Sequence, residues 1–222
     1  LPATFPHVLA FPLQVALMTD RSFPLALPGL VHVRNRIDVL RPIGTGEALD
    51  LEVRAERFAA HRSGATVDLC ASVSAGGSEV WRGRSTYLAR GATAPDGAPA
   101  SDVDVPVGDV PEGAIRWRVA DDTGRRYARV SGDVNPIHLS GLTAKAFGFP
   151  RQIAHGMWSL ARCVATLENR FTDAVTVDVA FKTPVLLPAT VRFHTTPDAG
   201  RFALVNPRSG APHLVGRTLP PG

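Results

Sequence analysis

The spacing of apolar and polar residues predicts antiparallel strands through most of the chain. In the first 90 residues, apolar side chains recur at every second position in four runs, which is the repeat of a strand with one buried face. Short Gly-containing segments separate the runs, as expected for turns between antiparallel neighbours. The four runs are Val31–Val39, Leu51–Ala55, Val67–Val73 and Val80–Ala89.

Two longer apolar segments interrupt this pattern and predict helices. Val8–Met18 is mostly apolar, and Pro12 within it marks either a first helical turn or a kink. His155–Asn169 repeats apolar residues at helical spacing. A strand at Ile115–Val119 and a shorter helix over residues 123–130 precede this second helix. Further strand-like runs follow it, at residues 175–182, 190–195, 201–205 and 212–218.

Each half of the chain is therefore expected to contain an apolar helix followed by four antiparallel strands. Wrapping a curved sheet around such a helix buries its whole surface. That arrangement is an α+β hotdog fold, and two in tandem form a double hotdog with two antiparallel sheets, each wrapped around a central helix. Residues 91–112, rich in Pro, Gly and small side chains, are predicted to link repeats at 1–90 and 113–222. The first strand of the first repeat is missing from the sequence, and we expect it upstream.

Charge and composition narrow the range of partners. The net charge is +4 with a pI of about 9.7, and nearly all basic residues are Arg, since Lys occurs only at Lys145 and Lys182. The sign suits a phosphate-bearing partner, such as coenzyme A or an acidic carrier protein. No basic cluster with interleaved aromatic residues indicates nucleic-acid binding, and no run of about 18 apolar residues predicts a membrane span.

The cysteines and the start of the chain suggest a cytoplasmic protein. Cys70 and Cys163 lie in different halves and lack metal-ligand spacing, so we expect reduced thiols and no metal site. Residues Leu1–Thr4 lack the charged head and apolar core of a signal peptide. They also lack Met, so the natural N-terminus is expected further upstream.

The residues with the clearest chemical potential lie between Tyr127 and His138. The sequence Ser131-Gly132-Asp133 ends a predicted helix at a Gly, which permits a left-handed exit. Asp133 and His138 then fall in one Pro-containing loop, which can bring the carboxylate and the imidazole together. Partial burial raises the pKa of Asp, and a nearby carboxylate raises that of His, so the pair can move protons near neutral pH.

A second candidate element is the predicted helix start at Ala154-His155-Gly156. Free N–H groups and the positive end of the helix dipole lie at such a start, and Gly156 lets a ligand approach the backbone. This arrangement can stabilise the enolate oxygen of a thioester. The alternative interpretation of Gly156 is a tight crossing against a sheet. His155 is interpreted as a helix-capping or packing residue rather than a proton carrier.

These segments resemble the signature of the MaoC-like, (R)-specific enoyl hydratases, especially the double-hotdog 3-hydroxyacyl-thioester dehydratases of mycobacteria. The resemblance rests on residues 127–138, Phe149 and residues 153–157, and extends less sharply over residues 179–185. It implies that Asp133 and His138 form the catalytic pair. It further implies that Asn135 supports the loop, that the Gly156 N–H binds the thioester oxygen, and that Ser159 helps to hold the site.

The family resemblance implies a hydro-lyase of fatty-acid metabolism that interconverts trans-2-enoyl and (3R)-hydroxyacyl thioesters. The substrate would be carried on the pantetheine of CoA or acyl carrier protein, and no cofactor would be needed. Residues 113–222 would form the catalytic repeat and residues 1–90 a non-catalytic one, whether the protein is a monomer or a dimer. The alternatives are a hotdog thioesterase and a catalytically inactive subunit that binds acyl thioesters. The spacing Asp-x-Asn-Pro-x-His argues against the first, and the intact pair argues against the second.

Overall fold

The computed structural model describes residues 1–27, 29–106 and 114–220, and the chain divides into two compact units. The first unit comprises residues 1–104 and 172–180 together with Pro220, and the second comprises residues 105–171 and 181–219. Residues 107–112 of the predicted linker lie outside the described residues. In the described part of that segment, residues 91–106, Val105 is the one buried side chain.

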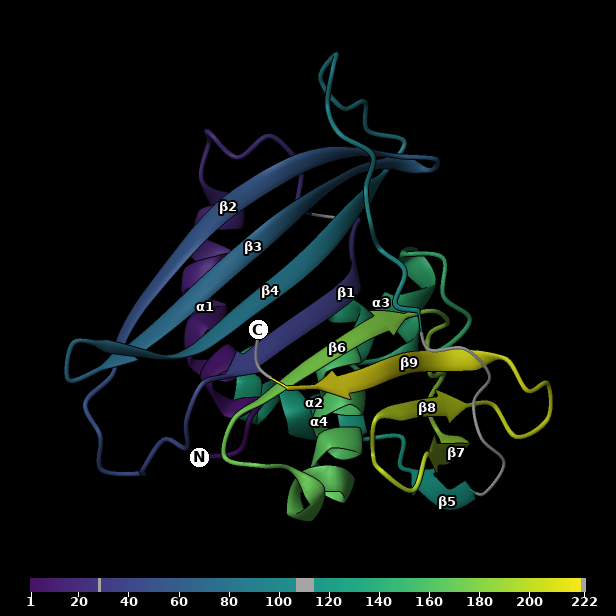
Figure 1. Cartoon of the computed structure of the whole chain (residues 1–222). Helices are drawn as coiled ribbons and strands as arrows, with labels where there is room; N and C mark the ends of the chain where they lie inside the picture. The colour runs from purple at the N-terminus through teal and green to yellow at the C-terminus, as the bar shows by residue number, and fades with distance from the viewer. Residues whose placement is uncertain (28, 107–113, 221–222) are drawn as a thin grey trace. The chain divides into compact units, whose positions relative to one another are not determined.

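The first unit consists of a helix packed on an antiparallel sheet. Helix α1 (Phe5–Thr19) lies against strands β2 and β3, and its Met18 packs with Leu69 and Tyr87 in the core (Figure 1). Pro12 stands inside the helix, whereas Pro6 occupies its first turn. The sheet order is β2-β3-β4-β1-β6. The strands are β1 (Leu30–Val39), β2 (Asp50–His61), β3 (Gly64–Ala75), β4 (Ser78–Arg90) and β6 (Val175–Phe181).

Strand β6 belongs to the first unit because it pairs with β1. The two strands run antiparallel from the pair Arg34 and Ala180 to the pair Val39 and Val175. The guanidinium of Arg34 donates to both carboxylate oxygens of Asp178 at 3.0 Å, and Asp178 is fully buried. The predicted repeat at residues 113–222 is therefore not one compact unit, because residues 172–180 group with the first part of the chain.

The second unit also contains an antiparallel sheet beside one main helix. Helix α4 lies against β8 and buries an apolar stripe that includes Leu160 and Val164. It begins at Gly156 and ends at Leu167, so it is shorter than the predicted helix, whose last residues form a 3-10 turn. The sheet order is β9-β8-β7-β5. The elements are β5 (Ala114–Val119), α2 (Thr123–Ser131), η1 (Pro136–His138), α3 (Gly141–Ala146), α4 (Gly156–Leu167), η2 (Glu168–Arg170), β7 (Ala189–Thr195), β8 (Arg201–Val205) and β9 (Pro212–Leu219).

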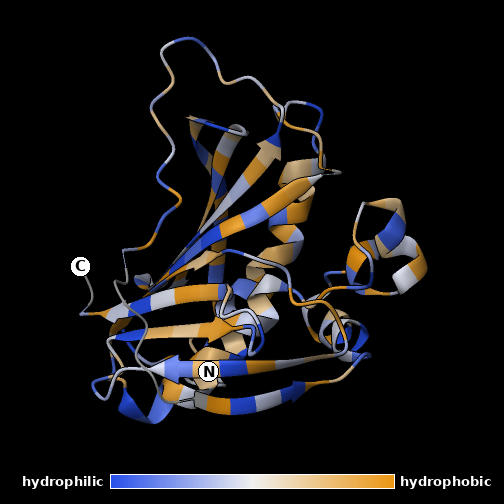
Figure 2. Ribbon diagram, turned by 90° about the vertical axis from the view of Figure 1, so that its right-hand side faces the viewer, coloured by the Kyte–Doolittle hydropathy of each residue, from blue (hydrophilic) through white to orange (hydrophobic). Residues whose placement is uncertain are grey.

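The predicted repeat of helix and sheet is thus confirmed within each unit. Hydrophobic and hydrophilic bands alternate along the strands in Figure 2, as expected when one face of each sheet is buried against a helix. None of the helices in the described part of the chain has the length and apolar character to cross a membrane.

Candidate active site

The loop that carries Asp133 begins where α2 ends. Gly132 adopts φ 73° at the C-cap, the left-handed exit expected from the sequence, and its N–H donates to the Ala128 carbonyl. The Asp133 N–H donates to Ser131 Oγ at 3.2 Å, and Asp133 Oδ1 accepts the Asn135 N–H at 3.2 Å. These local bonds hold the Asp133 carboxyl group at the turn instead of leaving it extended into solvent.

Asn135 supports the position of His138 through the short 3-10 helix η1. The side-chain oxygen of Asn135 accepts the Ile137 N–H at 3.3 Å and so caps this helix. Pro136 occupies the first turn, where a missing N–H has no cost. His138 at the end of η1 is 8% exposed, so the loop delivers an imidazole to the protein interior.

The ring of His138 has a defined tautomer. Its Nδ1 lies 2.9 Å from the Ile153 carbonyl oxygen, which can only accept, so Nδ1 carries the hydrogen and donates it. The Ile153 N–H in turn donates to the Ile137 carbonyl at 3.1 Å. With Nδ1 protonated in the neutral ring, Nε2 has the lone pair that can take up a proton.

Gly124 is a residue of this site that the sequence interpretation did not identify. A Cβ at Gly124 would lie 2.0 Å from the His138 carbonyl oxygen, so the start of α2 can approach the loop only without a side chain. An isolated Gly inside a predicted helical segment was the available signal, because such a residue often marks a close backbone contact.

The structure places the His155 side chain in contact with both Asp133 and His138. His155 occupies the N-cap position of α4, but its side chain makes no capping hydrogen bond. Its Nε2 lies 3.0 Å from the Asp133 carbonyl oxygen and 3.7 Å from Asp133 Oδ2. Its ring stacks on that of His138 with centroids 3.6 Å apart, and Tyr127 lies on it with centroids 4.9 Å apart. Of the two expected roles, packing rather than capping describes His155.

Gly156 and Ser159 lie on the first turn of α4. A Cβ at Gly156 would meet the ring of Phe181 at 3.1–3.3 Å, so Gly156 makes the tight crossing that was the alternative interpretation. Its N–H also stands at the helix start, where the first amides have no carbonyl one turn earlier. Ser159 is buried, and its hydroxyl donates to the His155 carbonyl at 3.4 Å.

Burial shifts the protonation of all three polar groups toward their neutral forms. Burial raises the pKa of Asp133, while the charge of His138 and the Asn135 N–H act in the opposite direction. Burial, and next the neighbouring His155, lower the pKa of His138 to about 4, although Asp133 opposes this. Burial likewise lowers the pKa of His155 to about 4. The 3.7 Å contact between His155 and Asp133 is therefore not an ion pair at neutral pH.

Asp133, His138 and His155 also form the one group of potential metal ligands found among the described residues. Their potential ligand atoms all lie within 4.8 Å of one another. However, each imidazole directs one nitrogen at a backbone carbonyl, and the two rings are stacked at an interplanar angle of 28°. Lone pairs lie in the ring planes, so nearly parallel rings do not converge well on one ion. The arrangement suits proton transfer better than metal binding.

Comparison with known proteins agrees with the fold and identifies the family. In the second unit, the loop of Asp133 and His138 lies before the main helix of a hotdog-type sheet and forms a candidate active site. The family model for the MaoC like domain matches residues 102–200. Over 216 residues the chain is 40% identical to 3-hydroxyacyl-thioester dehydratase X of Mycobacterium tuberculosis, covering 96% of this chain and 77% of the relative. The chain belongs to the MaoC-like dehydratase family.

Solved structures extend this comparison. The crystal structure of HtdX from M. tuberculosis superposes with a TM-score of 0.84 at 38% identity, covering 98% of this chain and 86% of that one. A MaoC-like dehydratase from Phytophthora capsici reaches a TM-score of 0.73 at 19% identity, covering 92% and 78%. A 12:0-ACP thioesterase from Umbellularia californica shares the fold at a TM-score of 0.55 and 14% identity, covering 95% and 87%. The fold alone therefore does not separate a dehydratase from a thioesterase.

Proposed function

We propose that the protein catalyses the reversible hydration of trans-2-enoyl thioesters to (3R)-hydroxyacyl thioesters, with Asp133 and His138 as the acid/base pair. The observation that carries this proposal is the placement of both groups in one cluster with His155, the residue just before α4, in which both histidines are buried and Asp133 is partly buried. The similarity to a 3-hydroxyacyl-thioester dehydratase over nearly the whole chain supports it. The acyl chain would arrive on the pantetheine arm of CoA or acyl carrier protein.

In this proposal the pair divides the two proton transfers of the reaction. In hydration, His138 Nε2 accepts a proton from water as its oxygen bonds to Cβ, and protonated Asp133 supplies a proton to Cα. Transfer of the proton from His138 back to Asp133 restores the starting state. Burial raises the pKa of Asp133 and lowers that of His138, and these are the directions that the proposed division of roles requires. No electrons are gained or lost, so the step needs no redox cofactor.

The start of α4 would stabilise the charge that forms on the thioester oxygen. The Gly156 N–H and the positive end of the helix dipole can interact with an enolate oxygen. The lack of a side chain at Gly156 also allows the Phe181 ring to pack against the helix start. Asn135 would keep η1 in place, and Ser159 would brace the first turn of α4 through the His155 carbonyl.

The experiment is a direct assay of the purified protein with crotonyl-CoA. Hydration removes the conjugated double bond, so we expect the ultraviolet absorbance of the enoyl thioester to fall while free thiol stays constant. Release of free thiol without loss of the double bond would instead identify a thioesterase. Absence of both signals over a range of acyl chain lengths and carriers would indicate a subunit that binds without catalysis. The Asp133→Asn variant serves as the control for contaminating activity.

A further inference from the structure

His155 is a buried titratable residue of the second unit that the proposed reaction does not use, and it lies against the acid/base pair. It is 2% exposed, and it touches both members of the acid/base pair through different parts of its ring. The Nε2 edge contacts the Asp133 carbonyl at 3.0 Å, while the face covers His138 with a centroid separation of 3.6 Å. One side chain is thus in contact with the backbone of Asp133 and the ring of His138.

One hydrogen bond fixes the tautomer of the His155 ring, and the surroundings of its other nitrogen disfavour a second proton. Because the Asp133 carbonyl only accepts, Nε2 carries the hydrogen, and the neutral ring then has its lone pair on Nδ1. Nδ1 is buried and finds no hydrogen-bond partner among the described residues. A second proton there would bury a charged donor with nothing to accept it, which is costly. His155 is therefore poorly suited to carry protons during turnover.

We propose that His155 is a positioning residue that holds the acid/base pair by two separable contacts. Its Nε2–H anchors the backbone of the Asp133 loop, and its ring shields and orients the imidazole of His138. Tyr127 is tilted against the His155 ring, with centroids 4.9 Å apart and an interplanar angle of 53°. This inference rests on the proposed function, because it assigns His155 to the same reaction.

The contact between the His155 and His138 rings affects the pH range in which His138 can act as a base. The titratable groups near His138 are Asp133 on the same loop and His155 before α4, and Tyr127 of α2 in turn lies against the His155 ring. Arg125 of α2 also donates to the Leu139 carbonyl at 3.2 Å, next to His138. Of these neighbours, the His155 ring covers the face of the imidazole. Its removal would admit water and bring the behaviour of His138 closer to that of an ordinary histidine.

Three substitutions separate the two contacts. His155→Gln keeps an amide N–H near the position of Nε2 but removes the ring. His155→Phe keeps a ring on His138 but removes the donor, and His155→Ala removes both. His7→Phe is the matched control, because His7 is also buried, lies near the start of α1 and stacks loosely on a second histidine. Circular dichroism and thermal unfolding establish that each variant is folded.

The test is the crotonyl-CoA hydration rate of these variants as a function of pH. We expect His155→Ala to lower kcat about 10²-fold, with a smaller effect on KM, because the reacting groups lose their alignment. In His155→Gln the loss of kcat should be smaller, but the acid limb of the pH profile should move to higher pH. In His155→Phe the acid limb should stay in place while kcat falls. His7→Phe should leave kcat and the pH profile unchanged.

Two outcomes would overturn the inference. Wild-type kcat in all three His155 variants would show that neither contact matters. An equal loss in all three, with an unchanged acid limb, would show that His155 only fills space. Failure of the proposed function is distinguishable from both, because the wild-type protein would then hydrate no enoyl thioester, or Asp133→Asn would retain full activity.

Discussion

The two units bury similar sets of rings, yet one of them contains the candidate site. In the first unit His7 stacks on His32 with centroids 6.2 Å apart, and Tyr87 stacks on His32. Burial lowers the pKa of His7 to about 4, and burial together with His7 lowers that of His32 to about 3. In the second unit the two histidines, His138 and His155, stack more closely, with centroids 3.6 Å apart, while Tyr127 is tilted against His155.

The difference lies in what surrounds the rings. Asp133 joins the histidines of the second unit, and no other cluster of three His, Cys, Asp or Glu ligands of this kind occurs in the described parts of the chain. The helix starts differ too, because α1 begins with Pro6 in its first turn, whereas α4 begins with Gly156. Pro6 has no N–H to offer a ligand, whereas Gly156 has one at the start of α4. The candidate site thus differs from the histidines of the first unit by a neighbouring carboxylate and by a helix start that has Gly156 in place of Pro.

Expressing the second half of the sequence without the first should reduce solubility and hydration activity more than any other change. Residues 113–222 expressed alone contain Asp133 and His138, but their β6 would lose its partner β1. The exposed strand edge and the loss of Arg34 beside Asp178 should make the fragment insoluble or inactive. Soluble yield, size-exclusion chromatography and hydration activity measure this. A soluble and fully active fragment would show that the first half is dispensable.

The acid/base pair should account for most of the catalytic rate. Asp133→Asn and His138→Ala should each lower kcat by about 10²–10⁴-fold, because each removes a group that transfers a proton. Both variants should remain folded by circular dichroism, since Asp133 is partly exposed and His138 sits in a loop. The assay is hydration of crotonyl-CoA, with thermal unfolding as the control. Near-wild-type turnover in either variant would remove that residue from the proposed pair.

The buried histidines of both units should make the fold sensitive to acid. Their folded-state pKa values lie below the ordinary value of about 6.5, so the unfolded chain binds more protons than the folded one. Their contribution to stability is present above pH about 6.5 and is lost as the pH falls toward 4. Each group contributes at most about 1.4 kcal/mol per pH unit, and Asp133, with its raised pKa, acts in the opposite direction.

Denaturant unfolding at pH 7.5 and pH 5 measures this effect. We expect a lower free energy of unfolding at the lower pH, and a smaller difference in His7→Phe, which removes one of the titrating groups. Equal free energies at both pH values would contradict the role of burial in setting these pKa values.

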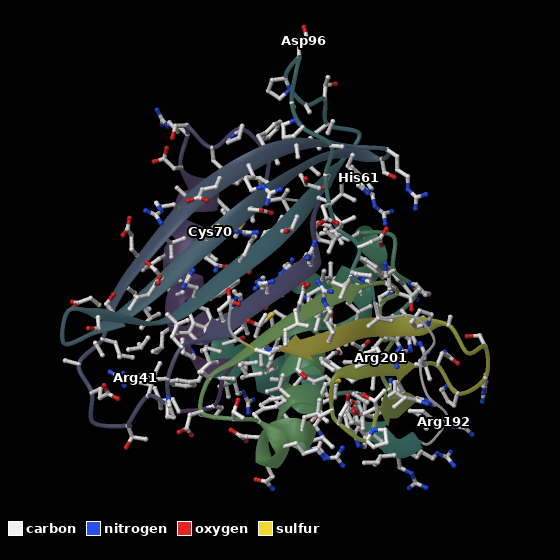
Figure 3. The ribbon with its side chains drawn as sticks, viewed as in Figure 1. Arg41, His61, Cys70, Asp96, Arg192 and Arg201 are labelled. Atoms are coloured by element: carbon white, nitrogen blue, oxygen red, sulfur yellow. The ribbon has the colours of Figure 1, made fainter. Side chains whose placement is uncertain are left out.

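Histidines of the first unit should have the smallest effect on turnover. His32 is a partly buried residue of β1, and His61, labelled in Figure 3, lies at the end of β2. His61 Nδ1 accepts the Ser63 N–H at 3.1 Å, which is a turn contact. His32→Ala and His61→Ala should each change turnover less than tenfold in the same assay. A larger loss in a folded variant would place a catalytic group in the first unit.

The sequence by itself determined the elements and the chemistry-bearing loop, because these depend on neighbours along the chain. Alternation of apolar residues placed the strands, and Gly132 marked the exit of α2 toward Asp133. Asn135 and Pro136 constrain the loop through bonds that span only a few residues. Local patterns of this kind persist into the folded state, since they do not depend on distant contacts.

Tertiary structure alone decided which distant groups meet. The stacking of His155 on His138 joins residues 17 positions apart, and nothing in the local pattern distinguishes it from packing elsewhere. The need for glycine at Gly124 follows from a loop that passes within contact distance of α2. The grouping of β6 with the first unit follows from its pairing with β1, which is remote in sequence. Such contacts depend on how the whole chain folds, because hydrogen bonding and burial act between groups that sequence spacing does not bring together.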